Sequence, residues 1–198
     1  MNAKNIAFAI MMGALGNVLF LISQGVGQIA QGIALDLSLI GVFIAGFYGG
    51  PLTGLTTGLI AGILPGIRFG PLGNGGALGL IGLPVGKALT GLTTGLLVKG
   101  LKLQRRTHQS LITAPVMLLA YVPEGIFTYV YFSFLLPLFT ENGMLPWAVI
   151  ATILLKATVE VIVMSVIMAA LVGNTGFRDF VAAHFTGMKT KEKTPSQP

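Results

Sequence analysis

Four ionisable side chains lie inside long apolar stretches of this sequence: Lys87, Glu124, Lys156 and Glu160. An ionised group at the centre of a bilayer costs on the order of 3 kcal/mol, so such residues usually face a cavity or one another. Counted along predicted helices at about 1.5 Å per residue, all four lie about 14 to 20 Å from one end of a span, near its middle. We therefore take them as candidate substrate-binding residues.

Two interpretations of this set remain open. Lys156 and Glu160 are four residues apart, hence on one helix face and able to pair, so the four groups can neutralise one another as structural ion pairs. Alternatively, they line a pocket that opens outward and binds a polar ligand. Pro123, directly before Glu124, favours the pocket, because a proline frees the carbonyl one turn back and can distort the helix at a site.

Three further polar residues are weaker candidates. Asn74 lies in the glycine-rich loop 68–76, where it either contacts a ligand or serves as a turn residue. Tyr121 either stacks on a planar ligand or packs within the bundle, which is the commoner role of an aromatic residue on a spanning helix. Asn17 lies on an apolar helix, and its simpler role is a hydrogen bond to a neighbour.

The sequence predicts no catalytic residue, metal site or cofactor. It contains no Cys, which removes thiolate chemistry, and its two histidines, His108 and His184, lie in predicted cytoplasmic segments. There is no HExxH motif, and the glycine-rich stretch 70–76 lacks the GK[ST] ending of a phosphate-binding loop. We expect a binding protein rather than an enzyme.

The composition is that of an integral membrane protein. Hydrophobic residues make up 54% of the chain and charged residues only 9%. Because a spanning helix needs about 20 mainly apolar residues, the sequence predicts an all-α membrane domain, 1–172, followed by a polar cytoplasmic tail, 173–198. The six predicted helices cover residues 5–23, 37–49, 52–67, 77–101, 110–139 and 147–172.

The basic residues between the spans predict the orientation. Nine of them fall on the side of the two termini, and only Arg68 falls on the other side. Cytoplasmic loops carry the excess of Lys and Arg, so both termini are predicted to lie inside a cell membrane that the chain crosses several times. The loops 24–36, 68–76 and 140–146 are then expected to face outward.

One eight-residue sequence, LTGLTTGL, occurs twice, at 52–59 and at 89–96. Its glycines are four apart and share a helix face, with threonines beside them. Interior glycine weakens a helix in water, but in lipid it lets two backbones approach closely, while threonine bonds to its own helix or to a neighbour. These two helices are therefore predicted to form the seam around which the other helices pack.

This pattern resembles the substrate-binding S-components of energy-coupling factor (ECF) vitamin transporters. Ala9 and Gly13 stand where that family has an AxxxA-type motif of small residues, with Gly in place of the second Ala. The sequence FYGGPLTG at 47–54 is similar to the family's fGPxxG turn. Lys156 and Glu160 resemble the Lys and Glu often found in its last helix.

The resemblance implies a division of labour between the two halves of the chain. The first three helices would contact a coupling transmembrane subunit through Ala9 and Gly13. Helices four to six would enclose a small vitamin-like substrate. Uptake would proceed by toppling of this component in the membrane, driven by two partner ATPase subunits.

The alternative class is a membrane sensor or interaction module. The glycine-rich spans and the loop 68–76 also resemble the membrane sensor domains of some histidine kinases. Such proteins normally carry a cytoplasmic signalling domain, whereas only 26 residues follow Val172 here. We therefore favour the carrier.

Overall fold

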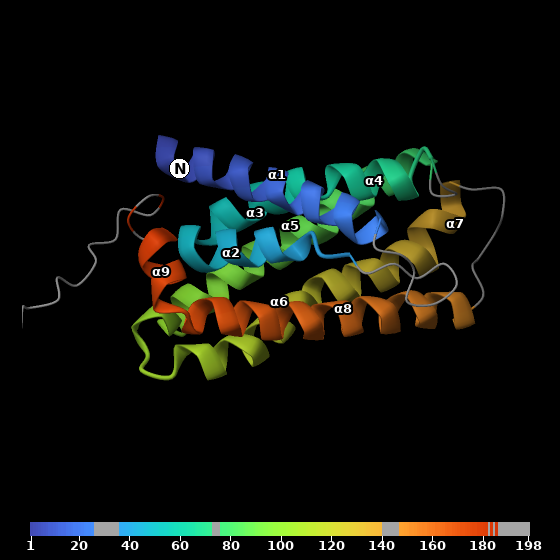
Figure 1. Cartoon of the computed structure of the whole chain (residues 1–198). Coiled ribbons are helices and arrows are strands. Elements are labelled where there is room, and N and C mark those ends of the chain that lie inside the picture. The colour runs from blue at the N-terminus through green and yellow to red at the C-terminus, as the bar shows by residue number, and fades with distance from the viewer. Residues whose placement is uncertain (26–35, 73–75, 140–146, 182, 184, 186–198) are drawn as a thin grey trace, which may run out of the picture.

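The computed structural model describes residues 1–25, 36–72, 76–139, 147–181, 183 and 185 (Figure 1). Within these ranges the chain forms helices and no strands. Five helical segments are long and apolar enough to cross a membrane, as the composition predicts. They are Ala3–Gly25, Pro51–Phe69, Gly76–Gly100, Gln109–Leu135 and Ile150–Gly173.

These segments correspond to helix α1 (Ala3–Gly25), the pair α3 (Pro51–Ala61) and α4 (Ile63–Phe69), helix α5 (Gly76–Gly100), helix α6 (Gln109–Val130) with a following π-helical turn (Tyr131–Leu135), and helix α8 (Trp147–Gly173). A short helix α7 (Leu136–Phe139) follows the π-helical turn, and a 3₁₀ turn, η1 (Leu103–Arg105), connects α5 to α6. The predicted helix positions agree with these bounds to within a few residues.

The predicted second span is a short central helix, α2 (Leu39–Gly49). Its eleven residues give a length of about 16 Å, roughly half of a bilayer's hydrocarbon core. Gly41 packs on the backbone of Met12, and the Ser38 carbonyl lies against Gly16, so α2 begins beside the middle of α1. A sixth full crossing is therefore not confirmed.

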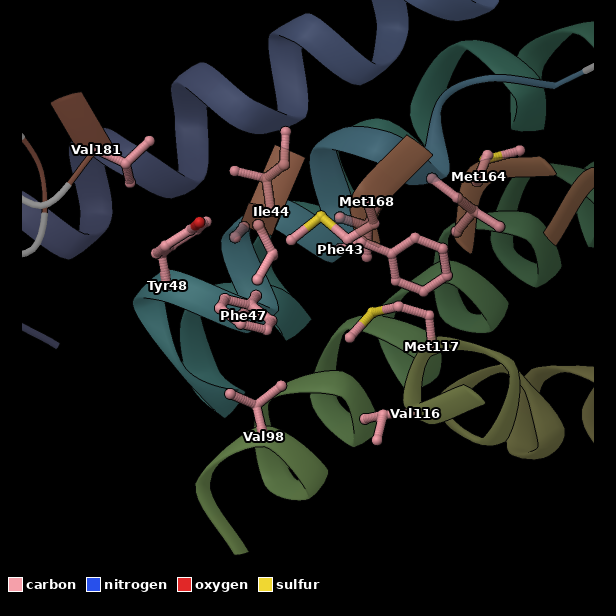
Figure 2. Close-up of a cluster of buried hydrophobic side chains, with 14 of the residues drawn as sticks. Phe43, Ile44, Phe47, Tyr48, Val98, Val116, Met117, Met164, Met168 and Val181 are labelled. Carbon is pink, nitrogen blue, oxygen red and sulfur yellow. The ribbon is translucent and has the colours of Figure 1, made fainter. Parts of the chain in front are cut away.

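Most of α2 is buried by the surrounding helices. The side chains of Phe43 and Phe47 are 0% and 1% exposed. Phe43 lies among Met117 of α6 and Met164 and Met168 of α8 (Figure 2). The apolar side chains of α2 thus join the two halves of the bundle.

The two copies of the repeat pack directly against each other. A β-carbon on Gly54 of α3 would collide with the carbonyl oxygen of Gly91 of α5, and one on Gly91 would collide with that of Gly54. Gly58 makes the same close approach to the backbone of Lys87. The order of these contacts shows that the helices run antiparallel, and the predicted seam is confirmed.

The threonines of the repeat bond in the two ways expected. Thr94 donates to the carbonyl of Thr90 in its own helix at 2.7 Å, and Thr57 donates across to the carbonyl of Ala9 at 3.3 Å. Both hydroxyls are fully buried, at 0% exposure. Each hydroxyl donates a hydrogen bond to a backbone carbonyl, because a polar group in lipid has no water to pair with.

Helices α3 and α4 form a broken span rather than the single helix that 52–67 predicts. Pro65 has no N–H and its ring crowds the carbonyl of Ala61, which disfavours an unbroken helix here. The side-chain amide of Asn17 donates to the Ile60 carbonyl at 2.8 Å and accepts from the Leu64 N–H at 3.1 Å. Ile60 and Leu64 are the partners of one ordinary helical hydrogen bond, so Asn17 inserts into it.

The start of the predicted tail is helical and packed. Helix α9 (Thr175–Val181) places Phe177 edge-on to Tyr48, with ring centroids 6.1 Å apart. Phe185 stacks on Phe8 of α1 at 5.1 Å. The boundary at residue 173 therefore does not begin a wholly polar, solvated segment, and residues beyond 185 lie outside the described ranges.

The two ends of the bundle differ in charge. The N-terminus, the α2–α3 turn, the α5–α6 connection and α9 lie at one end, whereas α4 and α7 lie at the other (Figure 1). The basic residues described at the first end are Lys4, Lys99, Lys102, Arg105, Arg106 and Arg178, against Arg68 at the other.

Candidate ligand-binding site

The intramembrane charges of the second half meet at the centre of the bundle, together with a residue from the first half. The Lys87 ammonium on α5 is 2.8 Å from a carboxylate oxygen of Asp36, and Lys87 is only 4% exposed. The backbone N–H of Asp36 donates to Glu160 on α8 at 2.7 Å. Asp36, which stands three residues before the start of α2 at Leu39, thus links α5 to α8.

The position of Asp36 corrects the expectation that the whole stretch 24–36 faces outward as a loop. Residues 26–35 lie outside the described ranges, but Asp36 lies against the buried Lys87, with its own side chain 15% exposed. Its carboxylate also accepts the Ser38 N–H at 2.9 Å, at the N-terminus of α2. An acidic residue directly before an apolar run is a known helix-start signal, but it does not indicate a contact with Lys87.

The charge of Asp36 is stabilised by its partners. Burial by itself raises the pKa of its carboxyl, but the ammonium of Lys87 and the hydrogen bonds from Ser38 outweigh burial and hold the pKa below its usual value.

The predicted pairing of Lys156 with Glu160 is confirmed. The ammonium and the carboxylate are 3.4 Å apart on one face of α8. Lys156 also lies over the ring of Phe69 on α4, 5.9 Å from its centroid. Each of the two intramembrane lysines is therefore already matched by a carboxylate of this chain.

Glu124 on α6 is the carboxylate left over. It is 8% exposed, and it accepts a hydrogen bond from the Thr90 hydroxyl of α5. Its side chain lies over Gly86, where a β-carbon would be 3.4 Å from the Glu124 Cγ. Among the described residues no cation lies within ion-pair distance of Glu124.

The central cluster therefore contains one more acidic than basic side chain. Asp36, Glu124 and Glu160 are acidic, whereas Lys87 and Lys156 are basic. Residues 26–35, which precede Asp36, contain no ionisable side chain that changes this sum. Within the described ranges no group of three or more His, Asp or Glu side chains is placed to hold a metal ion.

Several buried hydroxyls in the same bundle have no hydrogen-bond partner among the described residues. They include Ser165 on α8 and Tyr131 at the π-helical turn. The Tyr131 ring covers Gly82, one turn from the Gly86 that faces Glu124. Buried polar groups normally have partners, so these atoms mark an interior with unused hydrogen-bonding capacity.

Comparisons with known proteins found no match. They covered protein-family models, curated protein sequences and solved structures.

The remaining predicted site residues fall in different places. Tyr121 is half-buried on α6, nearly one turn before Glu124, and packs at the edge of the apolar core. Asn74 lies outside the described residues. Asn17 does not approach the charges, because it bonds to α3 and α4 on the other side of the seam.

Ala9 and Gly13 lie inside the chain rather than on a free surface. Ala9 is 0% exposed, and its carbonyl accepts the Thr57 hydroxyl. A β-carbon on Gly13 would be 2.6 Å from the Ile60 Cβ of α3. These small residues let α1 approach α3, so the contact with a coupling subunit expected of them is occupied in this structure by the chain itself.

Proposed function

We propose that this chain is the substrate-binding membrane component of an ECF-type importer, and that it binds a small vitamin-like solute between α5, α6 and α8. The observation that carries the proposal is the surplus carboxylate of Glu124. It is buried, it accepts one hydroxyl, and both lysines of the cluster are already paired with other carboxylates, so it is the acidic group available to a ligand.

The purely structural interpretation accounts for only part of the cluster. Ion pairs explain Lys87 with Asp36 and Lys156 with Glu160. They leave Glu124, which is buried and has no cation within ion-pair distance among the described residues, and burial of a carboxyl group without such a partner costs free energy. A ligand that presents an ammonium or another hydrogen-bond donor would satisfy this carboxylate and leave both existing pairs intact.

The division between the two halves of the chain also supports the proposal. Among the described helices α1 to α4, charged residues stand only near helix ends, whereas α5, α6 and α8 carry charges in their interiors. Contact with a coupling subunit would use the outer side of α1, where Ile6, Ile10 and Leu21 are 47% to 57% exposed. The charge difference between the two ends supports a cell-membrane location with both termini inside.

The experiment is identification of what copurifies with the chain. The full chain and two variants are purified in mild detergent, and bound small molecules are released and analysed by mass spectrometry. Glu124→Gln removes the carboxyl group of the candidate site, and Asp179→Asn makes the same chemical change at an exposed side chain. We expect wild type and Asp179→Asn to retain one small polar compound and Glu124→Gln to lose most of it.

Two results would count against the proposal. One is the absence of any retained compound from the folded wild-type chain, with none bound from a panel of vitamins. The other is equal retention by all three proteins, which would place the ligand away from Glu124. Circular dichroism of each variant checks that the helices are intact.

A further inference from the structure

A cavity of about 550 Å³ lies at the basic end of the bundle. Its walls are the α2–α3 turn, the C-terminal part of α5 and the connection to α6. Lys99 lies on α5 twelve residues after Lys87, which is about 18 Å along the helix. The cavity is therefore separate from the central charge cluster.

The charged residues that line this cavity are all basic: Lys99, Lys102 and Arg105. None of the three has an ion-pair partner among the described residues. Three cations around one concavity, with no carboxylate among the described residues of its lining, favour an anionic ligand.

The segment that presents these cations is fixed to the bundle. Leu103, between Lys102 and Arg105, is 0% exposed and anchors the turn η1 in the core. The side-chain amide of Gln104 donates to the carbonyl of Phe47 near the end of α2. The basic side chains therefore project from an ordered backbone.

Apolar surface adjoins the cations. Gly95 of α5 packs on Pro51 of α3, and the next residue on each helix, Leu96 and Leu52, is 51% and 59% exposed. On two spanning helices such leucines face hydrocarbon. A ligand that reaches both surfaces has an anionic head and an apolar tail.

We propose that this cavity binds the phosphate of an anionic lipid, with Lys99, Lys102 and Arg105 contacting the headgroup and Leu52 and Leu96 contacting the acyl chains. Basic pockets between spanning helices bind lipid headgroups in this way. Lys4 and Arg178 also lie at this end of the bundle but do not line the cavity. A general preference of basic residues for one side of the membrane therefore does not explain why Lys99, Lys102 and Arg105 line the same cavity. The proposal is independent of the solute site at Glu124.

Native mass spectrometry of the full chain in detergent tests this directly. Phosphatidylglycerol and phosphatidylcholine are titrated onto wild type, onto Lys102→Gln/Arg105→Gln, and onto the control Lys4→Gln/Arg178→Gln. We expect wild type and control to prefer phosphatidylglycerol, and the cavity variant to bind it about tenfold more weakly or worse, since each basic residue near a lipid surface contributes on the order of 1 kcal/mol. The charge-preserving variant Lys102→Arg/Arg105→Lys should keep the preference.

Two outcomes would overturn the proposal. An equal loss in the cavity variant and the control would mean that only the overall charge of this end matters. Binding of inorganic phosphate as tight as that of phosphatidylglycerol would identify a free anion as the ligand and exclude the lipid. A thermal melt of each variant shows that any loss of binding occurs in the folded protein.

Discussion

Glu124 and Asp36 show how differently two carboxylates of one cluster are used. Asp36 has a cation, a helix N-terminus and a backbone bond to Glu160 around it, and its role is to join elements. Glu124 has one hydroxyl donor. The arrangement of Asp36 is typical of a structural ion pair. That of Glu124 leaves its carboxyl group available to a further hydrogen-bond donor.

The pair of Asp36 and Lys87 gives a prediction for stability. Asp36→Asn alone or Lys87→Met alone should lower the free energy of unfolding by about 3 kcal/mol or more, because each leaves a buried group of the opposite kind without its partner. The double variant should lose clearly less than the sum. Unfolding by denaturant in micelles measures all four corners of this cycle, and strict additivity would show that the two groups do not interact.

Sequence reasoning found the charges of this cluster but not all of its members. Lys87, Glu124, Lys156 and Glu160 stand out because each interrupts a long apolar run. Asp36 was missed because it stands at the end of a polar, glycine-rich stretch. Its depth depends on where α2 begins along α1, which is a tertiary contact that no local pattern encodes.

At the scale of helices, the glycine seam sets how closely α3 and α5 pack. Gly54→Ala should destabilise the protein by about 1–3 kcal/mol or more, since the new methyl group meets the rigid backbone of Gly91. Gly100→Ala, at the end of α5, has nothing within 4 Å of the new carbon and should be neutral or slightly stabilising. Thermal unfolding of the two variants would contradict the seam if their losses were equal.

The break between α3 and α4 yields a second test at this scale. Asn17→Leu should cost about 2–4 kcal/mol, because it leaves the Ile60 carbonyl and the Leu64 N–H unpaired inside the bundle. Pro65→Ala permits an unbroken helix, so the double variant should recover part of this loss. If Asn17→Leu lowers the free energy of unfolding equally with and without Pro65, the Asn17 amide does not compensate for the hydrogen bond lost at the break.

Most helices could be predicted from hydropathy, because residues that must be apolar across a bilayer leave a long, simple signal. The exceptions have local physical causes. Helix α2 is surrounded by protein, so its length is not set by the membrane. Helix α9 is too short to be recognised as apolar, and it is held by contacts of Phe177 and Val181 with the core.

At the scale of the whole molecule, the basic end of the bundle and its central polar cluster lie in different places. Basic residues gather at the end that holds both α9 and the cavity proposed for lipid, whereas the central polar cluster is formed by side chains of α5, α6 and α8 together with Asp36. The buried position of Ala9 and Gly13 moves the proposed coupling face to the outer side of α1. A carrier needs such a separation, since its cargo and its partner must be recognised independently.

The dissociation constant of the copurifying compound, measured for wild type and for Glu124→Gln in the same detergent, tests the central claim most directly. We predict that the substitution raises this constant about tenfold or more, because a hydrogen bond to a charged group contributes about 1.5–3 kcal/mol. An unchanged dissociation constant in a folded Glu124→Gln protein would contradict the assignment of the surplus carboxylate to ligand binding.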